Sequence, residues 1–224
     1  MDAVKPPDRV GSSRRQRAQA TRLRITKAAS ALFCERGYAG TTMADIADAA
    51  GVAVQTVYFV FHTKSDVLSS TYDLAVLGEG DPAPPRAQEW YRQAVAEPTV
   101  AAAVRAVVGG AGEIVRRVAP LDLAVRTAAA SETDAALFLA LNERMRVEGY
   151  REMVDVLSTK SPLRAGLSAE RATDLLFLLV SPAAYRTLVA DLGWTHDEWV
   201  AWSSEALTEQ LFGIPGRTLT PGRA

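Results

Sequence analysis

A short stretch between residues 41 and 64 carries side chains that can contact both the bases and the phosphates of DNA. The amide of Gln55 can pair with adenine through two hydrogen bonds, and apolar side chains nearby can contact the methyl group of thymine. We expect four residues to lie nearest the base edges: Val54, Gln55, Thr56 and Phe59. Four others carry a hydroxyl, an imidazole or an ammonium group that suits phosphate oxygens: Thr42, Tyr58, His62 and Lys64.

Two short helices are needed to position these side chains. The spacing of apolar residues predicts one helix over 43–50 and a second over about 54–61. Thr42 and Asp45 have the spacing of a capping box at the start of the first helix, and Gly51 supplies the positive φ of the corner. This pattern is typical of a helix-turn-helix, whose second helix enters the DNA major groove. The same pattern also fits a helical corner that has no role in DNA binding.

The sequence around this corner resembles the TetR family of repressors over roughly residues 20–75. The shared residues, all in register, are Gly37-Tyr38, Thr41-Thr42, Ile46-Ala47, Tyr58, Phe61 and Lys64. The resemblance implies a DNA-binding head of three helices, a fourth helix that ties the head to a helical body, a homodimer, and a small-molecule effector. Val60 departs from the family pattern, which commonly has His or Tyr there, and this puts a phosphate or packing contact in doubt.

Composition describes an ordinary soluble chain of 224 residues, with 48% hydrophobic and 23% charged residues. The net charge of −1 does not favour nucleic acid, but residues 1–77 carry +3 and the remainder −4. Basic charge is densest from Arg14 to Lys27, with six bases and no acid, and such a run suits phosphate attraction or a solvated helix face. A single cysteine, Cys34, excludes a disulfide framework and a thiolate metal cluster. With no membrane-length apolar run and no signal-peptide core, we expect a cytoplasmic protein.

The chain reads as all-α, with a DNA-binding domain over 21–77 and an effector-binding and dimerisation domain over 86–213. Residues 1–20 read as a disordered basic tail and 214–224 as a flexible tail. The first helix is expected from the high teens to Arg36, and the fourth from Lys64 to about Leu77. Helices of the body are expected at 86–95, 98–117, 121–131, 134–158, 168–190 and 196–212. Pro120 and Pro182 are read as helix breaks or starts.

Two sets of residues in the body are functional candidates, although core packing explains either set as well. Aromatic, aliphatic and orienting polar residues predict the lining of an apolar effector pocket: Trp90, Tyr91, Arg126, Phe138, Leu141 and Asn142. The resemblance implies a dimer formed by a helix pair, which we assign to 134–158 and 168–190. Its interface residues are predicted to be Met145, Ala172, Leu175, Leu176, Leu179 and Ala183.

Enzyme chemistry finds no support in the sequence. His62 and His196 are the only histidines and lack metal-ligand spacing, and no phosphate-binding glycine loop or nucleophile elbow is present. We therefore predict neither cofactor nor metal, and no membrane partner. The predicted function is a dimeric transcription regulator, a repressor that a small apolar effector releases from a near-palindromic operator in double-stranded DNA. The alternative is a ligand-binding or sequestering protein of the same fold that has lost specific DNA binding.

Overall fold

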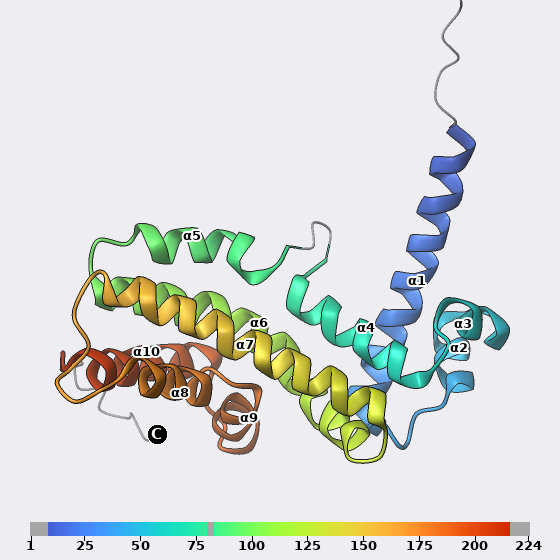
Figure 1. Cartoon of the computed structure of the whole chain (residues 1–224). Coiled ribbons are helices and arrows are strands. Elements are labelled where there is room, and N and C mark those ends of the chain that lie inside the picture. The colour runs from blue at the N-terminus through green and yellow to red at the C-terminus, as the bar shows by residue number, and fades with distance from the viewer. Residues whose placement is uncertain (1–8, 80–82, 216–224) are drawn as a thin grey trace, which may run out of the picture. The chain divides into compact units, whose positions relative to one another are not determined.

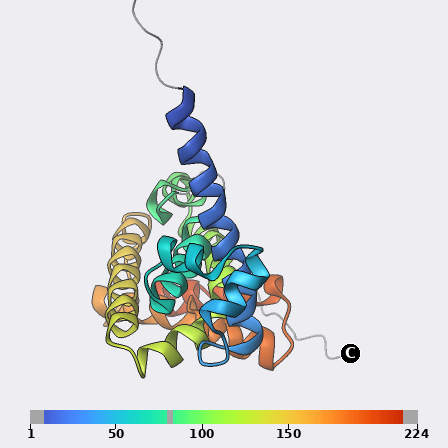
Figure 2. The same ribbon diagram turned by 90° about the vertical axis from the view of Figure 1, so that its right-hand side faces the viewer.

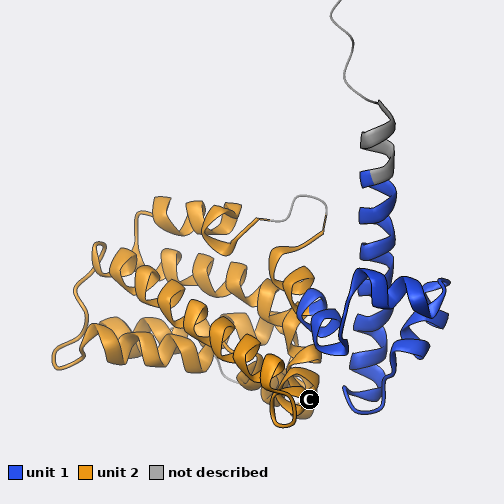
Figure 3. Cartoon of the chain, turned by 45° about the vertical axis from the view of Figure 1, so that its right-hand side comes forward, with its two compact units in different colours: residues 1–71 blue, residues 72–224 orange. Residues whose placement is uncertain are grey.

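A computed structural model of the protein describes residues 9–79 and 83–215, with only the backbone of residues 9–14. Within those ranges all regular structure is helical, which confirms the predicted fold class. The chain divides into two compact units, residues 1–71 and 72–224 (Figure 3). The division falls inside helix α4 (Lys64–Leu77) and not at the Gly- and Pro-rich segment after it, so this one helix contributes to both units.

Unit 1 consists of α1 (Arg9–Arg36), α2 (Met43–Ala50), α3 (Val54–Val60) and the first turns of α4 (Figure 1). The bounds of α2 and α4 are those expected from the sequence. An apolar stripe on α1 is buried at Ile25, Ala29, Leu32 and Phe33. Gly37, at φ +70°, ends the helix in the left-handed conformation that favours glycine. Tyr38 then stacks on Phe33, with ring centroids 5.8 Å apart, as expected of a residue that folds back on the helix end.

The expected disordered tail is wrong for residues 9–20, because they form the N-terminal part of α1, a single unbroken helix (Figure 2). Composition explains the error, since Arg, Gln and Ala are strong helix formers and fill residues 14–20. The prediction of disorder rested on two prolines, a glycine and two serines in residues 1–13, with no apolar period. Residues 1–8 of that tail, like residues 216–224 of the other, lie outside the described residues.

Unit 2 is built around a long central helix, α6 (Val100–Ala129), which packs against helices from before and after it in the chain. Before it lie a 3-10 turn, η1 (Pro85–Ala87), and α5 (Glu89–Ala96). After it come α7 (Thr133–Ser158), α8 (Ala169–Leu179), α9 (Pro182–Tyr185), a π-helical segment η2 (Arg186–Asp191) and α10 (His196–Phe212). In Figure 1, α6 and α7 run side by side, with α5 on one side of them and α8 and α10 on the other.

The two internal prolines of unit 2 behave differently. Pro120 was expected to separate two helices, yet α6 passes through it without a break. Pro120 is exposed, whereas Val118, Ala119 and Leu121 beside it are buried, so packing of the other face outweighs one missing backbone hydrogen bond. Pro182 does divide its helix, as predicted. It occupies the first turn of α9, where the missing N–H costs little, and the Ser181 hydroxyl caps that turn by accepting from the Ala184 amide at 3.0 Å.

Among the described residues, no single helix is long and apolar enough to cross a membrane. Two bent pairs, α2 with α3 and α8 with residues 182–191, reach that length and composition only when both members are taken together.

Candidate nucleic-acid interface and effector cavity

The corner between α2 and α3 has the geometry of a helix-turn-helix. The chain bends by 106° between the two helices, within the range of that motif. Gly51 makes the turn at φ +61°, a conformation that a side chain would strain. Ala47 is 1% exposed and Val57 is fully buried, as close packing of the two helices requires.

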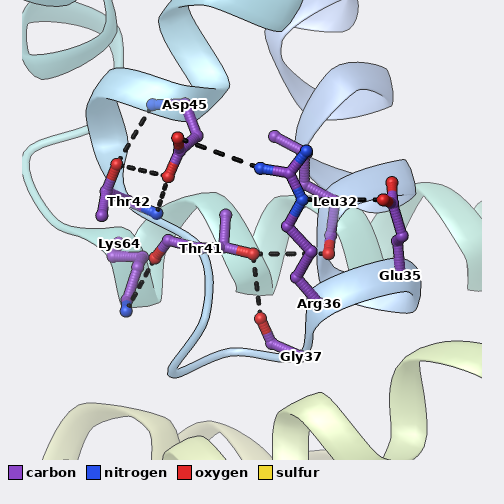
Figure 4. A network of polar contacts seen from close by, with 8 residues as sticks. All are labelled: Leu32, Glu35, Arg36, Gly37, Thr41, Thr42, Asp45 and Lys64. Carbon is purple, nitrogen blue, oxygen red and sulfur yellow. Dashed lines mark hydrogen bonds and ion pairs between the residues drawn. The ribbon is translucent and has the colours of Figure 1, made fainter.

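A capping box fixes the start of α2 (Figure 4). The Thr42 hydroxyl accepts from the Asp45 amide at 3.1 Å, and the Asp45 carboxylate accepts from the Thr42 amide at 2.8 Å. Hydrogen bonds from the hydroxyl and then the amide of Thr42 hold the pKa of Asp45 below its ordinary value. Arg36 adds a longer contact to the same carboxylate, at 4.0 Å. The negative charge lies at the positive end of the helix dipole, which stabilises α2.

The outer face of α3 presents the side chains predicted to contact DNA. Gln55 is exposed, Val54 and Thr56 are half-buried, and Phe59 is 85% exposed. Tyr58 is 52% exposed and His62 is exposed just beyond the helix end. A large aromatic side chain in solvent on a seven-residue helix gains nothing from the protein's own core. This face is therefore available to a partner.

Lys64 differs from its predicted role as a phosphate ligand. Its ammonium donates to the carbonyl oxygen of Tyr38 at 2.9 Å. It also donates to the carbonyl oxygen of Thr41 at 3.0 Å (Figure 4). It also lies 4.1 Å from the centroid of the Tyr38 ring. The side chain thus ties the start of α4 to the loop between α1 and α2. Hydrogen bonds from a charged donor are among the stronger ones in proteins, and this gives Lys64 a structural role that the sequence did not reveal.

The start of α4 is itself capped by side chains of its own first turn. The amide of Thr63 donates to the Asp66 carboxylate at 3.0 Å, and the Asp66 amide donates to the Thr63 hydroxyl at 3.0 Å. Nearby, the Val60 carbonyl accepts from Arg22 at 3.3 Å, and the Arg22 guanidinium lies 4.2 Å from the centroid of the Phe61 ring. At the position where the family pattern is not followed, the backbone of α3 is therefore held by α1.

Unit 2 contains a cavity of about 340 Å³ lined by the last turns of α4 and by α5, α6 and α7. Four aromatic residues contribute to its wall: Tyr72, Trp90, Tyr91 and Tyr150. Aliphatic side chains of α6 and α7 complete most of the rest, while Asp73, Asn142 and Arg146 supply polar groups. A mostly apolar cavity of this size with a few polar groups suits a small organic ligand.

Two close contacts fix the aromatic wall. Trp90 packs directly on α6, since a Cβ at Gly110 would lie 2.1 Å from Cγ of Trp90. Its indole N–H donates to the side chain of Gln88 at 3.0 Å. On α7, the Tyr150 hydroxyl donates at 2.6 Å to the carbonyl of Val180, which the helix break before Pro182 leaves without its usual partner. Burial raises the pKa of Tyr150, so its phenol stays protonated and remains a donor.

Three of the six predicted pocket residues line the cavity: Trp90, Tyr91 and Asn142. The other three do not. Arg126 is paired with Asp122 at 3.0 Å and Glu143 at 3.3 Å, Phe138 lies against the Tyr72 ring, and Leu141 is 45% exposed. On α7 the cavity face begins at Asn142 and continues at helical spacing through residues 146, 149, 150 and 153. That spacing was the available signal for Arg146, which the prediction missed.

The predicted dimer interface also needs correction. Ala172 and Leu176 are fully buried in the core of their own protomer and cannot face a partner. Met145, 50% exposed, lines the cavity. The remaining predicted residues lie farther out: Leu175 and Leu179 are half-buried, and Ala183 is exposed. Apolar spacing alone did not separate the inner face of α8 from its outer face, where Leu178 is 62% exposed.

Known proteins match the chain most specifically in unit 1. Residues 25–71 match the family model of bacterial regulatory proteins of the tetR family. The HTH-type transcriptional regulator TtgR of Pseudomonas putida is 41% identical over 59 residues, which is 26% of this chain and 28% of TtgR. The HTH-type transcriptional regulator AcrR of Shigella flexneri is 37% identical over 67 residues, 30% of this chain and 31% of AcrR. The matched part is thus less than a third of either relative.

Solved structures are similar over most of the chain. The fatty acid degradation regulator FadR from Bacillus halodurans has a TM-score of 0.66 at 20% identity, over 84% of this chain and 94% of that one. FadR from Bacillus subtilis, in complex with stearoyl-CoA, has a TM-score of 0.64 at 19% identity, over 86% and 98%. NalD, the secondary repressor of the MexAB-OprM efflux pump in Pseudomonas aeruginosa, has a TM-score of 0.62 at 19% identity, over 87% and 98%. At these identities the similarity establishes the fold.

The 106° corner, the exposed face of α3 and the helical second unit define a class of fold, an all-helical protein with a helix-turn-helix. Residues 25–71 match the DNA-binding part of bacterial regulatory proteins of the tetR family, and most of the chain shares the fold of solved regulators such as the TetR transcription regulator from Haloarcula marismortui.

Proposed function

We propose that this protein is a repressor that binds a near-palindromic operator as a homodimer and is released by a small apolar or aromatic effector. The observation that carries the proposal is the outer face of α3, where Gln55 and the 85%-exposed Phe59 stand on a rigid corner. Gln55 can pair with adenine, while Val54 and Phe59 can contact thymine methyl groups. A protein that binds operator DNA acts where the DNA is, which in a bacterium is the cytoplasm.

Phosphate contacts are assigned to the exposed hydroxyl of Tyr58 and the exposed imidazole of His62, because the Thr42 hydroxyl, also predicted to contact phosphate, donates its proton to the Asp45 carboxylate. Such contacts orient the recognition helix without reading sequence. Lys64 is not counted among them, because its ammonium already donates to two carbonyl groups. Its contribution to DNA binding is to hold the loop that carries Thr42.

The effector is assigned to the cavity of unit 2. Four aromatic side chains form its wall, and the structurally similar FadR of Bacillus subtilis is in complex with the acyl ligand stearoyl-CoA. Helix α4 is the proposed lever. Its first residue, Lys64, is bonded to the loop before α2, and Tyr72 and Val76 near its other end line the cavity. A ligand that shifts α4 moves the head, and a 100-fold loss of operator affinity requires about 2.7 kcal/mol of coupling.

Dimerisation is assigned to the outer faces of α7 and α8. Three large apolar side chains there are substantially exposed: Leu137, Leu141 and Leu178. A two-fold axis through this surface gives two recognition helices and hence a near-palindromic operator. Leu178→Arg places a charge on the surface without disturbing the core, unlike a change at the buried Leu176. We expect sedimentation to show a monomer for Leu178→Arg, and an intact dimer for that variant would move the interface elsewhere.

Selection of bound sequences from random duplex DNA tests the proposal directly. A repressor should select a near-palindrome with half-sites about one helical turn or slightly more apart. A hydrophobic ligand panel is then titrated while tryptophan fluorescence and operator release are followed on the same sample. Trp90→Phe is the control that identifies the fluorescence change of the cavity. Ligand binding without any selected DNA sequence would instead support a sequestering protein of the same fold.

A further inference from the structure

The N-terminal half of α1 is a strongly basic helix that the helix-turn-helix does not need for its own packing. Residues 9–34 contain seven Lys or Arg and no acid. Among the side chains described from residue 15 onwards, the first buried one is Ile25, and residues 15–20 are all exposed. From Arg9 to Arg24 the helix extends for about 24 Å, at 1.5 Å per residue. This segment, residues 9–24, is called the basic arm below.

The charges of the basic arm oppose the helix that carries them. Its first turn has no acidic residue, and bases near a helix N-terminus are unfavourable to the helix dipole. A polyanion beside the arm would remove this penalty, so the arm is electrostatically suited to one.

The arm begins beside the recognition helix. The Arg22 side chain lies over the Phe61 ring at 4.2 Å and donates to the Val60 carbonyl at 3.3 Å. It therefore touches the C-terminal end of α3, the region where Tyr58 and His62 are exposed. Exposed bases then continue towards the N-terminus at Arg17 and Arg15. An anion that contacts the end of α3 can continue along this helix.

We propose that the basic arm binds the phosphate backbone of DNA flanking the operator half-site. This inference rests on the proposed function. At about 3.4 Å per base pair, a 24 Å helix spans about seven base pairs beyond the region next to α3. An anionic membrane is the weaker partner, because the arm lacks an apolar face and Leu23 is the one large apolar side chain among residues 15–24.

The test compares two duplexes that contain the selected operator, one ending at the operator and one extended by about 10 base pairs, one helical turn, at one end. The variant Arg15→Gln/Arg17→Gln removes two exposed charges of the arm and keeps good helix formers. The matched control, Arg105→Gln/Arg151→Gln, removes two exposed charges from unit 2 and gives the same net charge.

For the unaltered protein, extension should steepen the slope of log K against log salt by about 1.8, from two phosphate contacts. This corresponds to roughly tenfold more affinity lost between 50 and 200 mM salt on the extended duplex. The control should behave in the same way, while the arm variant should show equal slopes on both duplexes. Amides of residues 15–24 should exchange more slowly on the extended duplex alone.

Equal slopes for the unaltered protein on both duplexes would overturn the inference and leave operator binding intact. Binding to phosphatidylserine vesicles that depends on Arg15 and Arg17, without an effect of the flanking DNA, would overturn it in favour of a membrane contact. If the protein selected no DNA sequence, the proposed function would be wrong, and the inference about the basic arm, which rests on it, would be wrong as well.

Discussion

Replacing Gly110 by alanine should destabilise unit 2 and displace Trp90 from the cavity wall. Two effects oppose each other at this position. Alanine in place of glycine inside a helix gains up to about 1 kcal/mol. Against this, the new Cβ would lie 2.1 Å from Cγ and 2.3 Å from Cβ of Trp90, the root of the side chain, which rotation of the ring end cannot move away. Overpacking costs about 1–3 kcal/mol, and contacts this short belong at the upper end of that range, so we expect a net loss of about 2 kcal/mol.

The neighbouring glycine provides the control. A Cβ at Gly109 would meet nothing within 4 Å, so Gly109→Ala should stabilise the protein by about 0.5–1 kcal/mol. In a Trp90→Gly background both of these atoms, Cγ and Cβ of residue 90, are removed and the clash with them is absent. There, Gly110→Ala should change sign and stabilise the protein by up to about 1 kcal/mol. This reversal separates the contact with Trp90 from any general intolerance of the helix.

Urea unfolding of the four variants measures these differences, and tryptophan emission of the folded state reports the position of Trp90. Gly110→Ala should shift the emission and weaken the binding of cavity ligands, whereas Gly109→Ala should do neither. If Gly110→Ala were as stable as Gly109→Ala, with unchanged emission, the close packing of Trp90 on α6 and its place in the cavity wall would both be refuted.

Four further outcomes are expected in unit 1. Gln55→Ala should cost about 1–3 kcal/mol of operator binding and relax the base preference at one base pair per half-site. Selection from random DNA measures that preference, and an unchanged preference would contradict the base-reading role of Gln55. Lys64→Ala should lower the unfolding free energy by about 1.5–3 kcal/mol and leave the salt dependence of DNA binding unchanged, because the partners of Lys64 are carbonyl groups. A weaker salt dependence at unchanged stability would instead assign Lys64 to a phosphate. Tyr58→Phe should weaken binding about equally on operator and random DNA at unchanged stability, and a loss limited to the operator would assign it to a base. The pKa of Asp45 is lowered in the folded state, so its contribution to stability is present above the unfolded pKa near 4 and is lost as pH falls through the folded pKa. The unfolding free energy of Thr42→Ala should therefore fall less steeply with acid than that of the unaltered protein. Identical curves would contradict the capping role of Thr42.

The features of unit 1 that the sequence predicted well are those set by neighbouring residues. A hydroxyl followed three residues later by a carboxylate specifies the cap at Thr42 and Asp45, and a glycine between two helical patterns specifies the turn at Gly51. Such local rules do not predict the hydrogen bonds of Lys64. They join residues 26 and 23 positions apart, and no local rule distinguishes an ammonium that bonds carbonyl groups from one that faces solvent.

In unit 2 the features that the sequence did not predict have a different physical cause. Pro120 and Pro182 carry the same local penalty, and burial of the flanking residues decides that one helix continues and the other divides. Leu176 and Leu178 are equally apolar and two positions apart, so they point to different sides of α8, and only the neighbouring helices determine which side is core. Arg126 was considered as a ligand group, but its partners Asp122 and Glu143 come from two helices whose pairing the sequence does not reveal.

The bond from Tyr150 to Val180 has an evolutionary consequence. Phenylalanine at position 150 would preserve the shape of the cavity wall yet leave a buried carbonyl without its donor, a loss of about 1–3 kcal/mol. A substitution at position 150 that makes the cavity wholly hydrophobic therefore lowers the stability of the fold, whether or not a ligand binds. Tyr91 and Asn142 are not tied to the helix break in this way, so changes in ligand preference are expected to accumulate there first.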